Sequence, residues 1–472
     1  MINDFLCSLD SSLLDAMSVM NNNSQKVCFV IDTNECLVGV LTDGDIRRSI
    51  LSGIELQAPI GKIISKDYVS GYQYDKTSLH LKKLNTKIRI IPIVNQENKV
   101  VDYVEYSQSA YFPVATPVLN GNEFKYLTDA FFSSWISSTG KYIDLFEEQF
   151  SNYSDCTYGV ALSNGTAALH LAMVALGVGR GDEVIIPDLT FAATINAVLH
   201  ANATPVIVDV ESDSWCIDPK GIEKAITENT KAIIPVHLYG QPCDMDAIMK
   251  IAKKYKLLVI EDCAEAHGAS FNGKKVGSFG DIGCFSFFGN KVITTGEGGM
   301  CITNSNEISS KLKLLRSHGM STTRKYWHTM VGFNYRLTNL QAAIGVAQLE
   351  RIDKIHDSRR MYENGYKEIL ENQNFTFQDD LKARKRITWL VSILAKSNFD
   401  KDKFMQSLKK HGIDARPFFY PLSEMDIYRD YCKVKTPVAK SLSEKGFNLP
   451  TYESLKSLGE LKRILNGLTN EL

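Results

Sequence analysis

A lysine lies between an apolar segment and a glycine-rich turn in the middle of the chain. Lys291 follows CFSFFGN at 284–290 and precedes VITTGEGGM at 292–300. Burial among apolar groups opposes the charge of a lysine and favours its neutral amine. Such an amine is a nucleophile that can form a Schiff base with a carbonyl compound. The alternative is a lysine exposed on a surface loop.

Acidic residues end a second apolar segment, LLVIED at 257–262. A buried carboxylate needs a cationic partner, and the protonated nitrogen of a pyridine ring would provide one for Asp262. The alternative is a metal ligand, but no set of histidines and carboxylates with metal-site spacing accompanies it.

Small residues open a helix-like segment earlier in the chain. Ser163-Asn164-Gly165-Thr166 precedes AALHLAMVALGV. The free N–H groups and positive dipole end of such a helix suit a phosphate, which Gly165 and Thr166 would hold. Ser286, five residues before Lys291, would add a hydroxyl. The alternative is an ordinary glycine turn, and His170 is expected in the core.

An aromatic residue follows the apolar segment EVIIP at 183–187. Phe191 is expected near the carboxyl end of a strand, where ligands collect in open α/β sheets, and its ring would stack on a planar group. Core packing is the alternative. Phosphate site, ring stacker, acidic strand end and lysine occur in the order 165, 191, 262 and 291. Together they predict an enzyme that binds pyridoxal 5′-phosphate (PLP).

The elements that must position these residues alternate between apolar strands and amphipathic helices. The segments EVIIP, PVIVDV, AIIPVH and LLVIED predict a mainly parallel sheet covered by helices. We expect a PLP-binding large domain at 111–360, with a helix at 338–356 leading out of it. A smaller C-terminal α/β domain is expected at 361–472, and a separate small α/β domain at 1–110.

Composition excludes several kinds of partner. The 472 residues include 53 basic and 54 acidic ones, for a formal net charge of -1. This balance disfavours binding to nucleic acid or to an anionic membrane. The N-terminus does not resemble a secretory signal, no apolar run approaches the roughly 20 residues that span a bilayer, and the ten cysteines form no C-x-x-C pair. We expect a cytoplasmic protein with reduced cysteines.

Four long segments resemble the DegT/DnrJ/EryC1/StrS sugar-nucleotide aminotransferases, from about residue 113 to the C-terminus. They are GTAALHLA, EDCAEAHGA, FSFFGNKVITTGEGGM and GFNYRLTNLQAAIGVAQL. The resemblance implies the PLP-dependent aminotransferase fold of type I, with helices on both faces of a mainly parallel sheet and a small C-terminal α/β domain. It also implies a homodimer with shared active sites.

The resemblance assigns a role to each candidate residue. Lys291 would carry the cofactor, Asp262 would pair with the pyridine nitrogen, and Glu265 would lie near the 3′-oxygen. Phe191 would stack on the ring. Phosphate would be bound by Gly165, Thr166, Ser286 and, from the other subunit, Asn334.

The reaction implied by the resemblance moves an amino group from L-glutamate to a nucleotide-linked 4-keto-6-deoxy sugar. YFPVATPVLNGNE, WISSTGKYIDLFE and RPFFYPLSEM look most like the members that convert GDP-4-keto-6-deoxymannose to GDP-perosamine for O-antigen or a related glycan. A UDP-linked keto-sugar is the alternative acceptor. An alternative of another class is a protein that senses nucleotides and has kept a PLP fold without turnover.

The N-terminal segment GVLTDGD at 39–45 resembles the nucleotide-binding signature of paired CBS (cystathionine-β-synthase-type) domains. By that resemblance Thr42 would face a phosphate and Asp45 the ribose hydroxyls of a regulatory nucleotide. Two similar halves within 1–110 suggest an internal duplication, but VVDYVEYSQSA at 100–110 lacks the matching residues. The alternative is a structural or dimerising domain without a ligand.

Overall fold

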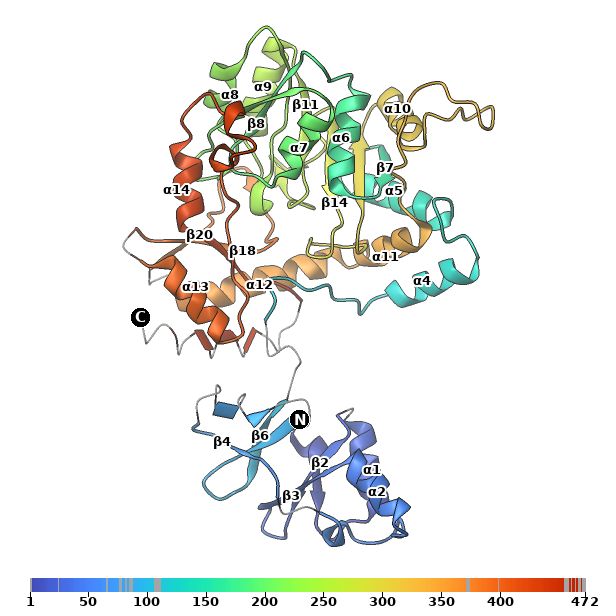
Figure 1. Cartoon of the computed structure of the whole chain (residues 1–472), viewed down its shortest axis with the longest axis vertical. Coiled ribbons are helices and arrows are strands. Elements are labelled where there is room, and N and C mark those ends of the chain that lie inside the picture. Colours follow the sequence, from blue (N-terminus) through green and yellow to red (C-terminus); the bar gives the residue numbers. More distant parts are fainter. Residues whose placement is uncertain are drawn as a thin grey trace. The chain divides into compact units, whose positions relative to one another are not determined.

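The chain forms two compact units, Met1–Phe112 and Pro113–Leu472 (Figure 1). The structure is a computed structural model. It describes residues 2–468 with gaps at 24, 65–66, 76–78, 81–82, 85–87, 106–111, 371–373, 398, 454–457, 460, 463 and 466–467. The domain boundary expected after residue 110 therefore lies outside the described residues.

The first unit contains two three-stranded sheets with the same topology. In each, the first strand is parallel to the second, which is antiparallel to the third. The strands are β1 (Leu6–Ser8), β2 (Val27–Ile31) and β3 (Leu37–Thr42), then β4 (Gly71–Tyr72), β5 (Ile90–Val94) and β6 (Val100–Glu105). This shared topology supports the duplication suggested by the sequence.

Two turns join the halves of the first unit. Cys36 and Lys99 form an isolated antiparallel bridge. The Leu37 N–H donates to the Asn98 carbonyl at 2.9 Å, and the Asn98 side-chain amide donates to the Leu37 carbonyl at 2.9 Å. Helices α1 (Leu13–Asn22) and α2 (Asp43–Leu51) belong to the first half.

A seven-stranded sheet forms the centre of the second unit, in the order β7-β15-β14-β11-β10-β8-β9. Strand β15 is antiparallel to both neighbours, and the other pairings are parallel. The strands are β7 (Tyr158–Leu162), β8 (Glu183–Pro187), β9 (Thr204–Val208), β10 (Thr230–Ile233), β11 (Leu258–Asp262), β14 (Ile282–Ser286) and β15 (Gly299–Thr303).

Both faces of this sheet are buried, which explains why its strands are continuous apolar runs. In β8, Ile185 joins one hydrophobic core, while Val184 and Ile186 join the other. The second core is completed by α6 (Gly165–Ala175), α7 (Ala193–His200) and α10 (Asn306–Arg316). The first is completed by α5 (Lys141–Tyr153), α8 (Pro219–Ala225), α9 (Met245–Tyr255), α11 (Asn339–Leu349) and α12 (Ile352–Leu370).

The C-terminal part builds a four-stranded antiparallel sheet in the order β16-β18-β20-β19. Its strands are β16 (Phe375–Phe377), β18 (Val391–Ala395), β19 (Arg416–Pro417) and β20 (Gly446–Leu449), with helices α13 (Lys401–Lys410) and α14 (Pro437–Lys445). A smaller sheet pairs β12 (Ser270–Phe271) with β13 (Lys274–Lys275) and with β17 (Arg384–Lys385).

The connecting helix differs from the sequence prediction. The stretch 338–356 is divided, because α11 ends at Leu349 and α12 begins at Ile352. Helix α12 then continues through residue 360, where the sequence placed the start of the small domain. That domain boundary stays a prediction.

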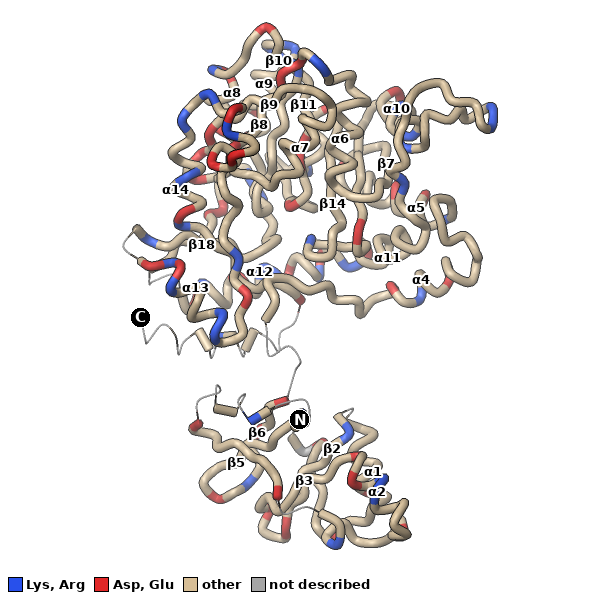
Figure 2. The backbone as a smooth tube through the Cα atoms, in the orientation of Figure 1, with Lys and Arg blue, Asp and Glu red and all other residues tan. Residues whose placement is uncertain are grey.

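Acidic and basic residues are interspersed over both units (Figure 2). None of the helices in the described part of the chain is both long and apolar enough to cross a membrane.

Gly240 offers a test of the packing between the large sheet and the C-terminal part. It has φ +88°, and a Cβ there would lie 2.1 Å from the Ile387 carbonyl oxygen. Gly181 has φ +93° with nothing within 4 Å of its Cβ position. Both alanine variants should lose ~1–2 kcal/mol through the left-handed backbone. Only Gly240→Ala adds a collision, so its midpoint of thermal unfolding should fall at least about 4 °C further than that of Gly181→Ala. Equal midpoints would contradict the packing described.

Candidate active site

The predicted residues of the second unit come from the carboxyl ends of neighbouring strands and the segments that follow. Asp262 ends β11 and Ser286 ends β14, and these strands are parallel partners. Lys291 lies in the connection from β14 to β15, and its Nζ is 3.5 Å from Oε1 of Glu265. The sheet topology thus brings the segments that follow β11 and β14 together at one edge, where ligands bind in open α/β sheets.

The first turn of α6 approaches the end of β14. A Cβ on Gly165 would lie 2.7 Å from the Ser286 Cβ, so only glycine fits this contact. Asn164 caps the helix by accepting the Ala167 N–H at 2.8 Å. The first N–H groups of a helix have no partner within it and attract anions. Gly165, Thr166 and Ser286 therefore form a cradle whose chemistry fits a phosphate.

Asp262 is 5% exposed, and its carboxylate accepts from the Thr194 hydroxyl at 2.8 Å and from the Ala264 N–H at 3.2 Å. Burial raises the pKa of Asp262, and these two donors, with the charges of Lys291 and His237, partly offset that rise. A cation in contact with this carboxylate would stabilise its ionised form. Thr194, one helical turn after Phe191, was missed at the sequence level although it lies in the same segment.

Glu265 is 4% exposed and accepts the main-chain N–H of Tyr239 at 3.0 Å. Burial raises its pKa to about 7, against the opposing effects of the Lys291 charge and of the Tyr239 N–H. Glu265 can therefore gain or lose a proton near neutral pH beside the Lys291 amine.

His267 supports the same edge of the sheet as a neutral residue. Burial lowers its pKa to about 3, and its Nε2 lies 2.9 Å from the Ser286 carbonyl oxygen. A neutral imidazole with its proton on Nε2 donates to that carbonyl. His267 thereby fixes the main chain of the residue that lines the cradle.

Aromatic rings form a wall from Lys291 to Phe191. Nζ of Lys291 is 4.0 Å from the ring centroid of Trp389, which stacks on Tyr239 at 6.0 Å. Tyr239 stacks on Phe419 at 5.4 Å, and Phe419 lies 5.6 Å from Phe191. Phe191 is 59% exposed, so its ring is available to a planar ligand rather than buried in the core. Nothing in the local sequence around Trp389, Tyr239 or Phe419 signalled this wall.

The neighbour of Asp262 has a different role, because successive residues of a strand face opposite sides. Glu261 is fully buried and accepts main-chain N–H groups from Gly277, Phe279 and Gly280. His237 lies 3.0 Å from it, and the three buried residues His237, Glu261 and Cys263 have metal-ligand spacing. Because these hydrogen bonds already occupy the oxygens of the Glu261 carboxylate, we explain the cluster as structural rather than as a metal site.

Asn334 lies next to Tyr335, whose carbonyl accepts the N–H of Ser163, two residues before Gly165, at 2.8 Å. It is exposed, and its Oδ1 accepts from Nε of Arg336 at 3.0 Å. Within the described part of the chain it has no contact with the cradle. Its predicted role requires a second subunit.

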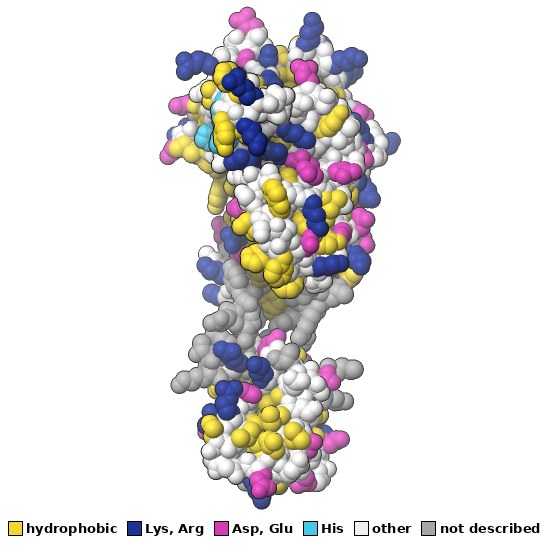
Figure 3. All heavy atoms as spheres, turned by 90° about the vertical axis from the view of Figure 1, so that its right-hand side faces the viewer, with side chains coloured by type: hydrophobic (Ala, Val, Ile, Leu, Met, Phe, Trp, Pro, Cys, Tyr) yellow, Lys and Arg dark blue, Asp and Glu magenta, His cyan; other side chains and the backbone are white. Residues whose placement is uncertain are grey.

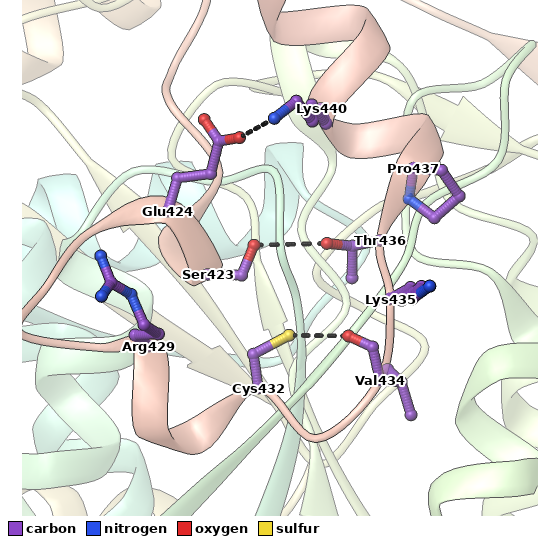
Figure 4. A pocket seen from close by; sticks show the side chains of 9 residues that line it. All are labelled: Ser423, Glu424, Arg429, Cys432, Val434, Lys435, Thr436, Pro437 and Lys440. Atoms are coloured by element: carbon purple, nitrogen blue, oxygen red, sulfur yellow. Dashed lines mark hydrogen bonds and ion pairs between the residues drawn. The ribbon is translucent and has the colours of Figure 1, made fainter.

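A cavity of about 390 Å³ lies near the N-terminus of α14 (Figure 4). It contains none of the predicted cofactor residues. Two of its polar groups already have partners: Lys440 pairs with Glu424 at 2.8 Å, and the Ser423 hydroxyl donates to Asp188 at 2.7 Å. We assign no ligand to it.

The donor set at the sheet edge fits PLP. A glycine-lined helix N-terminus with a hydroxyl suits the phosphate, an exposed aromatic ring suits the pyridine face, and a buried carboxylate of raised pKa suits the pyridinium. A partly buried lysine lies beside them. Fold and site together define a PLP-dependent aminotransferase.

The relatives of the chain agree with this class. Residues 117–469 match the DegT/DnrJ/EryC1/StrS aminotransferase family, and residues 1–52 match a CBS domain. GDP-perosamine synthase of Escherichia coli O157:H7 is 44% identical over 347 residues, covering 74% of this chain and 95% of that protein. GDP-perosamine synthase of Vibrio cholerae is 43% identical over 361 residues, covering 76% and 98%.

Solved structures show the same fold. An aminotransferase from Psychrobacter cryohalolentis superposes with a TM-score of 0.70 at 30% identity, covering 76% of this chain and 99% of that one. Helicobacter pylori PseC, an aminotransferase involved in the biosynthesis of pseudoaminic acid, gives 0.72 at 28% identity, covering 77% and 100%.

The chain belongs to the DegT/DnrJ/EryC1/StrS aminotransferase family. The predicted fold class, the cofactor PLP and the enzyme class are confirmed. The roles of individual residues stay predictions.

The raised pKa of Glu265 predicts a pH dependence of stability. Because its pKa rises from 4.5 unfolded to about 7 folded, the folded state binds the proton more tightly. This contribution, roughly 3 kcal/mol, is present below pH 4.5 and is lost as pH rises through 7. Glu265→Gln keeps a neutral side chain at every pH. In protein freed of cofactor, the midpoint of thermal unfolding of Glu265→Gln should therefore rise relative to wild type between pH 5 and pH 8. A difference that stays constant with pH would contradict the assigned cause.

Proposed function

We propose that the protein transfers the amino group of L-glutamate to C4 of GDP-4-keto-6-deoxymannose, giving GDP-perosamine. The observation that carries this proposal is the identity of 43–44% with three GDP-perosamine synthases, each covered over 95–98% of its length. The predicted cofactor-binding residues, from Gly165 to Asn334, lie within the part of the chain that matches the family.

In this proposal, residues of the chain bind and orient the cofactor, and one of them moves a proton. PLP supplies an electron sink when bound. Asp262 holds the ring nitrogen in its charged form, and Gly165, Thr166 and Ser286 hold the phosphate. Nζ of Lys291 carries a proton from the amino donor and returns one to the acceptor.

A UDP-linked keto-sugar is the second candidate acceptor. UDP-N-acetyl-3-dehydro-alpha-D-glucosamine 3-aminotransferase of Acidithiobacillus ferrooxidans is 38% identical over 363 residues. This lower identity favours the GDP-linked acceptor. The non-catalytic alternative is disfavoured, because Lys291, Asp262 and the phosphate cradle are all retained in one place.

We also propose a homodimer with shared active sites, in which Asn334 reaches the cradle of the partner subunit. Its support is a set of exposed aromatic side chains on and after α4 (Glu123–Phe132). Phe124 is 81% exposed, Phe132 78% and Trp135 61%. Figure 3 looks onto this side of the second unit and shows hydrophobic side chains there. Exposed apolar patches of this kind mark interaction surfaces.

We propose that the enzyme works in the cytoplasm and that its product serves an O-antigen or a related surface glycan. The proposed domains are 1–110, 111–360 and 361–472, the first of them regulatory.

Replacement of Lys291 tests the proposed reaction. Lys291→Ala should remove the visible absorbance band of lysine-bound PLP and lower turnover with L-glutamate and GDP-4-keto-6-deoxymannose at least about 10³-fold, because no other side chain supplies the amine. Lys275→Ala, which removes another partly buried lysine, should keep both. Product is measured by mass spectrometry, with the UDP-linked keto-sugar assayed in parallel. Turnover by Lys291→Ala would overturn the assignment, and faster amination of the UDP sugar would overturn the acceptor.

We propose a regulatory nucleotide site in the first unit at Thr42 and Asp45. In the structure these residues form a capping box at α2: the Thr42 hydroxyl accepts the Asp45 N–H, and the Asp45 carboxylate accepts the Thr42 N–H at 2.9 Å. Ser12 and Asp15 form the same box at α1. The capping box alone is therefore no mark of a nucleotide site.

The two caps provide a matched pair of variants. Thr42→Ala and Ser12→Ala should each lower stability by ~1 kcal/mol through loss of a cap. Only Thr42→Ala should also weaken binding of adenine or guanine nucleotides to the full-length protein, by about tenfold through loss of a phosphate contact. Calorimetric titration measures the nucleotide affinity of both variants. Absence of binding by wild type, or equal affinity in both variants, would refute the site.

A further inference from the structure

Trp389 contacts Lys291 through its ring and the preceding residue, Asn290, through its indole nitrogen. The Lys291 Nζ lies 4.0 Å from the ring centroid. The indole N–H donates to the main-chain carbonyl of Asn290 at 2.8 Å. Trp389 is 3% exposed and lies just before β18, about a hundred residues after the lysine.

Arg359 of α12 ties the same two segments together. Its guanidinium donates to the Lys291 carbonyl at 3.3 Å and to the Trp389 carbonyl. It is 4% exposed, and burial lowers its pKa to about 10 while Glu453 opposes that change. The carbonyls of residues 290 and 291 are thus both held by side chains from beyond residue 350.

We propose that Trp389 is a positioning residue for Lys291, holding the main chain just before the lysine through its N–H and the free amine through its ring. The inference rests on the proposed function, in which Lys291 carries the proton. The ring contact applies to the stage of the reaction in which Nζ is not bonded to the cofactor, whereas the hydrogen bond to Asn290 holds the main chain at every stage.

The geometry limits where the amine can go. A lysine side chain has four rotatable carbon bonds, so a free amine would otherwise sample many positions. The face of an indole ring attracts an ammonium within about 6 Å of its centroid. Glu265 attracts the same group at 3.5 Å. Between ring and carboxylate, Nζ is kept at the sheet edge beside Asp262 and the cradle.

A purely structural role is the competing explanation, because Trp389 also packs against Tyr239. Trp215 provides a matched control for it. This tryptophan is also 3% exposed, and its ring lies 6.5 Å from Tyr239 and 5.2 Å from Phe418. It packs in the same aromatic cluster and has no contact with Lys291 among the residues described.

The first measurement is the single-turnover rate with L-glutamate for PLP-loaded Trp389→Leu, Trp389→Phe and Trp215→Leu. Trp389→Leu should be about tenfold slower than wild type, from loss of a cation–π contact and a hydrogen bond. Trp389→Phe, which retains a ring, should fall between. The L-glutamate concentration giving half the maximal rate should change less than about twofold. Equal slowing by Trp215→Leu would overturn the inference.

The second measurement repeats the comparison in a Lys291→Ala background, with methylamine added as a substitute amine. If Trp389 acts through Lys291, Trp389→Leu should have no further effect there. An undiminished effect would show that Trp389 only packs the core. Methylamine-free turnover by Lys291→Ala would instead refute the proposed function.

The visible circular dichroism of bound PLP gives a readout that does not depend on turnover. It tests the inference even if methylamine does not restore the activity of Lys291→Ala. Its amplitude reports how rigidly the lysine holds the ring. Trp389→Leu should reduce this amplitude at equal PLP occupancy, and Trp215→Leu should not. Unchanged ellipticity in Trp389→Leu would overturn the inference.

Discussion

Burial of ionisable groups at the carboxyl edge of the seven-stranded sheet constrains the rest of the second unit. Asp262 and Glu265 are both at most 5% exposed, and Lys291 is the cation beside them. An unpaired buried charge is strongly destabilising, so each group needs donors or an opposite charge. Thr194, Ala264 and the Tyr239 N–H supply them.

Tyr239 shows how this requirement shapes the backbone. It has φ +50°, a left-handed conformation that is uncommon for residues other than glycine and costs of order 1 kcal/mol. In this conformation its N–H reaches Glu265, and its hydroxyl accepts the Phe419 N–H at 3.0 Å. Its ring stacks on Trp389. These contacts offset the strain and connect the buried carboxylate with the C-terminal part of the chain.

The two units differ in their relation to known enzymes. The perosamine synthases are matched over almost their whole length by 74–76% of this chain. The match to the aminotransferase family begins at residue 117, so the first unit is an addition to the matched catalytic part. Its two halves share one topology, and the match to the CBS domain covers residues 1–52, the half that contains Thr42 and Asp45.

The sequence alone indicated the strands β8, β9, β11 and β14, the cofactor class and the candidate residues near the strand ends, whereas the run AIIPVH at 232–237 was placed too late, because β10 spans Thr230–Ile233. Short continuous apolar runs are typical of strands buried on both faces, and EVIIP coincides with β8 residue for residue. Lysine and acidic residues beside such runs stand out, because burying a charged side chain costs free energy unless a partner offsets it. These signals are local and can be recognised within about ten residues.

Only the tertiary structure decided which distant side chains complete the site. Four of these side chains lie in segments whose local pattern is that of ordinary core: Trp389, Arg359, Tyr239 and Phe419. They meet Lys291 and Phe191 because the C-terminal part packs against the sheet edge. The division of the expected helix 338–356 into α11 and α12 could not be predicted from the local sequence either, because both halves favour helix. Contacts between residues far apart in sequence depend on packing, which no local pattern encodes.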